Sequence, residues 1–453
     1  MIKKILLPIL LLCAFSAGAQ LNNSWIDYSK TYYKFKLGAD NICRIAQPVL
    51  AGAGIGNAIA DHYQLWKNGQ QVRLFTSVNA APLGASDFIE FMGEMNDGKA
   101  DKELYRQPQL QLADKYSLET DTAVYFLTVN PAGGNLRYAS AANPSPGSAS
   151  PDPYFMRSID IYYRNLLNRG YARDLRTYVF SSSYDIGEGY TSGEINPGVV
   201  FTENITGLNV YTGGPANSLK VRGKFFGNSD NSTRTVSLKL FNTQVYTDTK
   251  TNTIEFIANE QDLPISYLQN TNNVPINVST TIPPLSTITD RLVISTLGIT
   301  YPATFNFNNL RSFSFELSAS TTGNYLLIDN FNSGGISPIL YDLSSGLRYT
   351  GDISTPGKVK FVLPPSANPN RKFILNSVDL TNINNINSLT SKTFINYNTA
   401  TTRADYVIIS NPLLYNDGSG TNNVELYRAY RSSANGGNYN AKIFDINELT
   451  DQF

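Results

Sequence analysis

Alternating apolar and polar positions dominate the first part of the chain and predict β-strands, because successive side chains of a strand point to opposite faces of its sheet. Residues 32–37 and 42–45, joined by a short polar turn, predict a hairpin. Asn68 and Gly69 predict the turn of a second hairpin, since this pair favours positive φ. The strands expected in this N-terminal β domain, residues 20–130, are 32–37, 42–45, the two arms of 63–72, 88–93 and 123–129.

The middle of the chain predicts a β-sandwich or jelly roll over 198–305 and a second, smaller β domain over 306–395, because short strands recur there between turn residues. Residues 131–197 are expected to be a linker with short elements, including an aromatic helix or strand at 154–164 and a strand at 175–180. The strands expected in the two domains are 199–203, 219–225, 235–240, 253–257 and 290–294, then 313–317, 325–328, 339–342, 358–363 and 372–376.

The pattern changes at the C-terminal end. Residues 404–410 form a β-branched apolar run that predicts a strand buried on both faces. Helical spacing follows at 424–433, then a strand at 439–445 and the start of a helix at 446–453. Strand, helix, strand and helix are the opening of an α/β domain. Two strands cannot bury a parallel sheet, so we expect 403–453 to be the first part of a domain that continues beyond Phe453.

Composition narrows the class of protein. The chain has 36 basic and 36 acidic residues, which argues against nucleic-acid binding. Only 16% of residues are charged, whereas 28 Tyr and 23 Phe are present, a composition typical of exported β-sandwich proteins.

The N-terminus predicts export. Lys3 and Lys4 precede the apolar run 5–15, and small residues ending at Ala19 suit cleavage before Gln20. We therefore expect a signal peptide at 1–19 and a location at the cell surface, at the outer membrane or outside the cell. Nothing in the sequence predicts a transmembrane helix.

Few side chains could carry catalysis. His62 is the only histidine, and Cys43 is the only cysteine outside the predicted signal peptide, so no disulfide can form within the mature chain. A thiol dyad would have to use both residues. His62 is expected to be a turn residue and Cys43 a small buried apolar residue.

Acidic pairs and a glycine-rich segment are weaker candidates. Asp87 with Glu90, and Glu188 with Glu194, could be the paired carboxylates of a glycosidase, although strands and loops often carry such pairs. Residues 52–56 are glycine-rich but lack the spacing of a nucleotide-binding loop, so a flexible loop is expected.

The predicted sandwich also raises the question of ligand binding. Tyr211 and Phe226 could be stacking platforms for a glycan, or they could belong to an aromatic core, which we favour. Residues 228–231 carry oxygens that suit calcium, or form an ordinary turn. No other cofactor is expected.

Segments at both ends of the chain resemble the gingipain-type (C25 family) cysteine peptidases, and in particular the sortases of type IX secretion within that family. At the C-terminal end the segments, as an ordered set, resemble the first βαβ unit of the peptidase domain in that family. The segments are 23–28, 65–70, 87–93 and 121–127 near the N-terminus, and 405–409, 427–428, 430–431, 442–445, 448–449 and 451–453 near the C-terminus.

The resemblance implies a mostly β chain that ends in the start of an α/β, caspase-like domain. It implies a parent that is a cysteine endopeptidase, a sortase that processes the C-terminal signals of exported proteins, with other type IX secretion components and those exported proteins as partners. The family's catalytic His-Gly pair and Cys lie on later strands, and neither is in this sequence. No catalytic, cofactor-binding or metal-binding residue is therefore assigned. The alternative is a non-catalytic surface β-sandwich protein that binds glycan or protein ligands.

Overall fold

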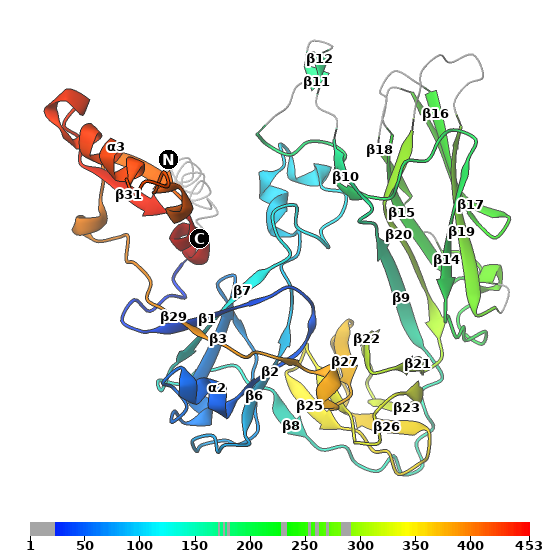
Figure 1. The fold of residues 1–453 in the computed structure, drawn as a ribbon. Helices are drawn as coiled ribbons and strands as arrows, with labels where there is room; N and C mark the ends of the chain where they lie inside the picture. The colour runs from blue at the N-terminus through cyan, green and yellow to red at the C-terminus, as the bar shows by residue number, and fades with distance from the viewer. Residues whose placement is uncertain are drawn as a thin grey trace, which may run out of the picture.

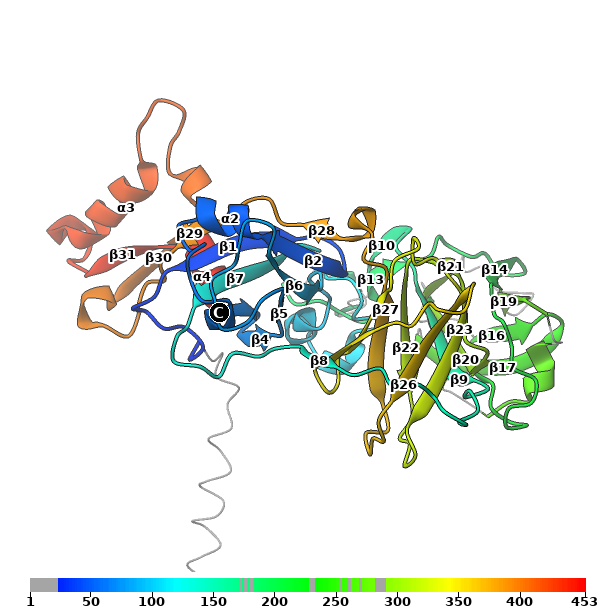
Figure 2. The same cartoon turned by 90° about the horizontal axis from the view of Figure 1, so that it is seen from below.

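The computed structural model describes residues 23–170, 173–174, 177–178, 182–227, 233–251, 255–258, 262–268, 271–281 and 291–453. The fold is mostly β, as predicted, with largely antiparallel sheets (Figure 1). No helix within these ranges has the length and apolar character needed to cross a membrane. The N-terminal β domain lies between the α/β unit (residues 403–453) and the other two β domains (Figure 2). The predicted signal peptide lies outside the described residues.

Two sheets that share one apolar core form the N-terminal β domain, with strand orders β29-β1-β7-β3-β4 and β28-β2-β6-β5. A short helix, α2 (Gln47–Gly52), follows β2. The strands are β1 (Tyr32–Leu37), β2 (Asn41–Ala46), β3 (Tyr63–Lys67), β4 (Gln70–Val72), β5 (Phe75–Thr76), β6 (Phe88–Gly93), β7 (Ala123–Val129), β28 (Asn384–Asn385) and β29 (Thr390–Lys392).

One predicted hairpin in this domain is confirmed and the other is wrong. Asn68 and Gly69 turn β3 into β4 with φ of 48° and 71°. In contrast, β1 pairs with β7 and β29, whereas β2 pairs with β6 and β28. Both strands bury their apolar sides in the same core, so the turn between them crosses from one sheet to the other. The partners β28 and β29 come from a segment about three hundred and fifty residues away in the chain, which no local pattern reveals.

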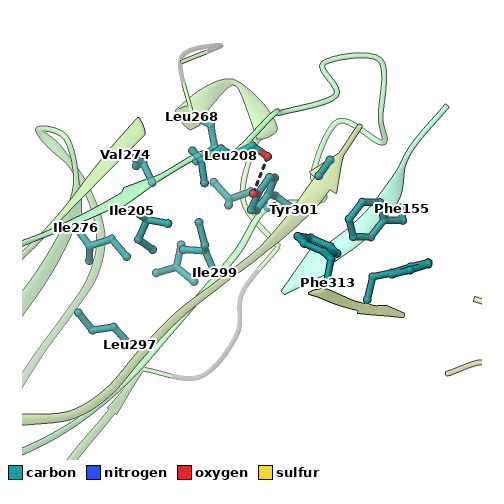
Figure 3. Packing of buried hydrophobic residues seen from close by; sticks show 14 of the residues in the cluster. Phe155, Ile205, Leu208, Leu268, Val274, Ile276, Leu297, Ile299, Tyr301 and Phe313 are labelled. Carbon is teal, nitrogen blue, oxygen red and sulfur yellow. Dashed lines mark hydrogen bonds between the residues drawn. The ribbon is translucent and has the colours of Figure 1, made fainter. Parts of the chain in front are cut away.

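The sandwich consists of two four-stranded sheets, β14-β19-β16-β17 and β18-β15-β20-β9. Inward-facing side chains such as Ile205, Ile276 and Ile299 fill the space between the sheets, and the buried Tyr301 hydroxyl donates to the Leu208 carbonyl at 2.8 Å (Figure 3). The strands are β9 (Phe155–Tyr162), β14 (Val200–Thr206), β15 (Lys220–Gly227), β16 (Thr233–Leu240), β17 (Thr243–Thr251), β18 (Glu255–Ala258), β19 (Asn273–Thr281) and β20 (Leu292–Ala303).

The second β domain has sheets β22-β27-β24-β25-β8 and β21-β23-β26. Its core continues into that of the sandwich, because Phe155 of β9 packs against Phe307, Phe313 and Phe315. Its strands are β8 (Ala139–Ala141), β21 (Asn306–Leu310), β22 (Ser312–Leu317), β23 (Asn324–Phe331), β24 (Ile339–Asp342), β25 (Leu347–Thr350), β26 (Lys358–Leu363) and β27 (Arg371–Asn376). Two further pairs are β10 (Leu166–Arg169) with β13 (Glu188–Thr191) and β11 (Arg173–Asp174) with β12 (Thr177–Tyr178).

A buried carboxylate joins the N-terminal β domain to the second β domain. Glu90 on β6 is 1% exposed and accepts hydrogen bonds from Arg44 at 2.7 Å and from the Tyr341 hydroxyl. Arg348 lies 3.8 Å from the same carboxylate. Both guanidinium groups also stack on aromatic rings of the N-terminal β domain. We call this contact the Glu90 joint.

Candidate functional site

The two residues that a thiol dyad would need lie on different elements, Cys43 in a strand and His62 in a short 3-10 helix. Cys43 lies on β2 with its side chain fully buried, and this burial raises the pKa of its thiol to about 12. His62 ends a 3-10 helix (Ala60–His62) before β3, is half-buried, and accepts a hydrogen bond from the Asn130 amide at its carbonyl. A thiol that stays protonated is a poor nucleophile. Cys43 therefore acts as a packing residue of the core.

The candidate acidic residues are each held by different partners. The Asp87 carboxylate accepts from Ser77 and from the Gly84 amide, each at 2.8 Å, whereas Glu90 belongs to the Glu90 joint. Glu188 accepts from the Asp185 amide at 2.9 Å, and Glu194 forms an ion pair with Arg291. Neither pair has the shared, open setting that a glycosidase requires.

The aromatic core that we favoured is confirmed for Phe226, which is 1% exposed and packs directly beneath Gly187, so this ring is no platform for a glycan. Tyr211 is half-buried and its ring stacks on Tyr154 with centroids 5.2 Å apart. The proposed calcium loop, 228–231, lies outside the described residues, and within them no three His, Cys, Asp or Glu side chains are grouped to hold a metal ion. In the glycine-rich segment 52–56, Gly52 and Gly54 are exposed, whereas the Ile55 carbonyl accepts a hydrogen bond from the Tyr63 hydroxyl at 2.6 Å.

The α/β unit forms as predicted. Its two strands, β30 (Tyr406–Ser410) and β31 (Ala441–Asp445), pair in parallel, and helix α3 (Asn423–Ser432) connects them. The Asn422 side chain caps α3 by accepting from the Glu425 amide. Gly437 has a φ of 104° in the turn that ends this helical segment, the left-handed conformation that glycine favours there.

Polar and aromatic contacts hold α3 against the strands. The Tyr406 and Tyr427 hydroxyls are 2.9 Å apart, and the Arg431 guanidinium lies over the rings of Tyr406 and Tyr439 at 4.4 Å and 4.8 Å. No residue of α3 is buried. The helix therefore covers the strand pair only partly.

The prediction that the first strand is buried on both faces is wrong in this chain. Val407 and Ile409 are 56% and 57% exposed, and Leu413 and Leu414, just after the strand, are 88% and 69% exposed. A parallel pair has two faces to cover, and α3 lies against only one of them. The apolar run that predicted a buried strand is therefore open to solvent on the other face.

The last helix, α4 (Ile446–Gln452), is the part of the α/β unit that contacts the N-terminal β domain. Asp445, the last residue of β31, caps α4 by accepting from the Asn447 amide. Lys34 of β1 donates to both carboxylate oxygens of Asp451, at 2.6 Å and 2.7 Å. Lys392 of the neighbouring strand β29 pairs with Glu448 and lies 3.1 Å from Asp451. We call this contact the α4 seat.

Main-chain contacts complete the α4 seat. The Ile395 amide donates to Glu448 at 3.2 Å, and the Gln452 amide group donates to the Ile395 carbonyl at 3.1 Å and to Glu448 at 2.9 Å. Glu448, Asp451 and Gln452 are at most 9% exposed. A single turn of helix thus places three buried polar side chains on the edge of a sheet.

The charge of Lys392 is stabilised in the α4 seat. Burial opposes its charge, but the hydrogen bonds to Glu448 and Asp451 outweigh that effect, so the pKa of Lys392 is raised. The seat is therefore a contact between ions rather than between apolar surfaces.

Sequence reasoning did not assign the residues of the α4 seat. Lys34 resembles an ordinary solvent-facing position of an alternating strand, Lys392 lies in a polar stretch without a strand signal, and nothing local shows that the two are neighbours. Glu448, Asp451 and Gln452 did occur among the segments that carried the family resemblance. Because these three residues stand at i, i+3 and i+4, they share one face of the helix, and that spacing was the sequence signal for a polar contact surface.

Comparison with known proteins supports a likeness of fold. No protein-family model matches the sequence, and no curated protein matches it. The chain is similar to the crystal structure of dimeric latent PorU from Porphyromonas gingivalis, with a TM-score of 0.55 and 11% identity. The similarity covers 94% of this chain and 38% of PorU, so the chain spans well under half the length of that protein.

Two further structures have TM-scores too low to support a common fold with this chain. Infectious bursal disease virus, Gx strain, gives a TM-score of 0.19 at 12% identity, covering 76% of this chain and 65% of the viral chain. The glycoside hydrolase domain of Endo-D from Streptococcus pneumoniae R6 gives 0.14 at 9% identity, covering 53% and 37%. The mostly β fold of this chain is therefore similar, along nearly the whole length of this chain, to the fold of part of PorU.

Proposed function

We propose that this chain is the non-catalytic region of an exported, cell-surface cysteine peptidase of gingipain type. Its α/β unit would be the first part of the peptidase domain. The observation that supports this most is the open parallel pair of β30 and β31, held by α4 on the N-terminal β domain. Further strands and helices would cover Val407 and Ile409 and complete the sheet.

The parent protein would be a type IX secretion sortase, which processes the C-terminal signals of exported proteins and has them and other secretion components as partners. The fold similarity to PorU supports this assignment. In a doubly wound sheet the site forms at the carboxyl ends of the strands, which here are Ser410 and Asp445. The catalytic Cys and His would stand on later strands of that sheet.

The experiment compares the native protein with a recombinant chain of residues 20–453, which lacks Cys13 of the predicted signal peptide. Antibodies raised against the recombinant chain are used to isolate the native polypeptide from the surface of the producing cells. We expect a longer polypeptide that begins at Gln20 and reacts with an iodoacetamide-type active-site label. The recombinant chain is the matched control, and its Cys43 should not label, because the thiol is buried and its pKa is about 12. A native polypeptide with the mass of this chain, and no labelling, would overturn the proposal.

A further inference from the structure

A groove with a volume of about 600 Å³ lies between the sandwich and the second β domain. Its walls include residues 155–160 of β9 and 312–316 of β22, consecutive in both cases. Alternate residues of a strand share a face, so a wall lined by consecutive residues is the edge of a strand and not its face. Both strands are outermost in their sheets, and both free edges border this groove.

The register of β9 shows which main-chain groups point into the groove. The Tyr163 amide donates to the Ser295 carbonyl, continuing the antiparallel register of β9 with β20. Hydrogen-bonded and non-hydrogen-bonded pairs alternate along such a ladder. Residues 155, 157, 159 and 161 therefore bond to β20, and the amide and carbonyl groups of Met156, Ser158 and Asp160 point outward.

The same reasoning applies to β22. The Ser377 amide donates to the Arg311 carbonyl, in register with the antiparallel pairing of β22 and β27. The outward-pointing main chain is therefore that of Ser312, Ser314 and Glu316. Along the described chain, no amide or carbonyl of these three residues, or of their three counterparts on β9, has a hydrogen-bond partner. All six residues line the groove.

The side chains around these edges are aromatic on one side and polar on the other. On the aromatic side, the Phe155 ring of β9 packs against Phe313 and Phe315 of β22, and Phe155 and Phe313 lie side by side in Figure 3. The Arg157 guanidinium lies 5.3 Å from the Phe313 ring centre. Lys372 and Glu316 are largely exposed at 64% and 54%. A strand in this groove would direct alternate residues to the aromatic side and to the charged side.

We propose that this groove binds an extended segment of a partner polypeptide, which enters between β9 and β22 as an added strand. Such a segment would satisfy main-chain groups on both of its edges and join a four-stranded and a five-stranded sheet. The volume lies within the usual range of about 300–1,000 Å³ for ligand sites. The free main-chain groups belong to two strand edges that border one groove, and strand addition by an extended chain is the way such edges are satisfied. The segment would alternate apolar residues with polar ones.

Fluorescence anisotropy tests the proposal on the full chain. The probe is a fluorescein-labelled peptide of about ten residues that alternates valine and threonine, with lysines at its ends. Ser314→Pro removes an amide that points into the groove, and proline is tolerated on strand edges whose amides face away from the ladder. We expect Ser314→Pro to weaken binding at least about tenfold and the matched control Ser314→Ala to bind as the wild type does. Equal binding by Ser314→Pro would overturn the proposal.

A second probe keeps the test independent of the fold of the variant. Peptides N-methylated at alternate residues, in either phase, cannot form one of the two hydrogen-bonded edges, and both should bind the wild-type chain more weakly. Undiminished binding would contradict strand addition. A dimer of the chain that Ser314→Pro abolishes would assign the groove to a second copy instead. Because the readout does not involve the α/β unit, the proposed peptidase role can fail or hold separately.

Discussion

The Glu90 joint and the α4 seat both attach another part of the molecule to the N-terminal β domain through carboxylates, yet they are built differently. Glu90 is 1% exposed and lies beside an apolar cluster that includes Ile42, Tyr138 and Ile339. In the α4 seat, the side chains of Lys34 and Lys392 remain 23% and 18% exposed, and no buried apolar residue of α4 accompanies them. The Glu90 carboxylate is sealed by this apolar cluster, although its partners Arg44 and Arg348 are 15% and 14% exposed, whereas the α4 seat has no such apolar surroundings.

The difference indicates which of the two contacts stays closed as long as the domains remain folded. A sealed ion pair cannot exchange its partners for water without opening the surrounding core, so it moves only when a domain unfolds. An ionic contact at the edge of a sheet can be hydrated and is weakened by salt. We infer that the N-terminal and second β domains form one rigid body, whereas the α/β unit can separate from it.

The largest effect is expected from Glu90→Ala. The substitution leaves Arg44 and Arg348 without their carboxylate inside a closed contact, and removing one partner of such a group costs about 3–5 kcal/mol of unfolding free energy. Urea denaturation followed by tryptophan fluorescence measures it. Glu94→Ala is the matched control, because the Glu94 side chain is 62% exposed in its pair with Lys67, and the change should stay below about 1 kcal/mol. An effect of Glu90→Ala as small as that of Glu94→Ala would contradict the claim that Glu90 is held in a closed contact.

Lys392→Ala should have a smaller and more local effect. It removes the pairing of Glu448 and weakens that of Asp451, and ion pairs that border water contribute about 0.2–1 kcal/mol each. Hydrogen exchange should speed up in residues 446–452 and remain unchanged at β6. Salt at about 1 M should have the same effect on the wild type, since the screening length is then about 3 Å. Faster exchange at β6 as well would mean that the two joints open together.

The pH dependence of the α4 seat follows from Lys392. Its pKa is raised in the folded chain, so its contribution to stability is complete below the unfolded value of 10.5 and is lost as the pH rises through the folded pKa. The difference in exchange at α4 between the wild type and Lys392→Met should therefore be constant from about pH 7 to pH 10 and then decline. A difference that already declines near neutral pH would show that another group controls the contact.

Local patterns predicted the strands of this fold better than their partners. β1, β6, β7, β24 and β26 have the predicted bounds, because each is mostly apolar and ends at or beside a residue that favours turns, although only β26 alternates strictly between buried and half-buried positions. The strands β28 and β29 are two and three residues long and polar, so neither leaves a periodic signal, yet they pair with β2 and β1. Pairing between distant segments depends on the whole core, which the sequence of one segment does not contain.

The same limit applies to the candidate site. The order of strands and helices in 403–453 was predicted from apolar runs and caps, and it is confirmed. The α4 seat was not predicted, since its lysines come from β1 and β29, whose adjacency is a product of the fold. Burial of the 404–410 run was predicted from its composition, but burial depends on neighbours that composition does not provide.

The smallest effect is expected from removing the α/β unit. A chain of residues 20–395 keeps β28 and β29, and it keeps Phe394, whose ring packs 5.3 Å from Trp25 and 5.1 Å from Tyr32. Without α4, Lys34 and Lys392 gain water in place of carboxylates, so no buried charge is left unpaired. We expect a cooperative thermal transition and a β-rich circular dichroism spectrum, with a midpoint within about 2 °C of the full chain.

A chain that ends at residue 382 is the matched control for this truncation. It loses β28, β29 and Phe394 as well, so both sheets of the N-terminal β domain lose an edge strand and the aromatic cluster opens. Its midpoint should fall far more than that of 20–395. If 20–395 instead gave a β-poor spectrum without a transition, the N-terminal β domain would depend on the α4 seat, and the inference that the α/β unit separates from a rigid body would be wrong.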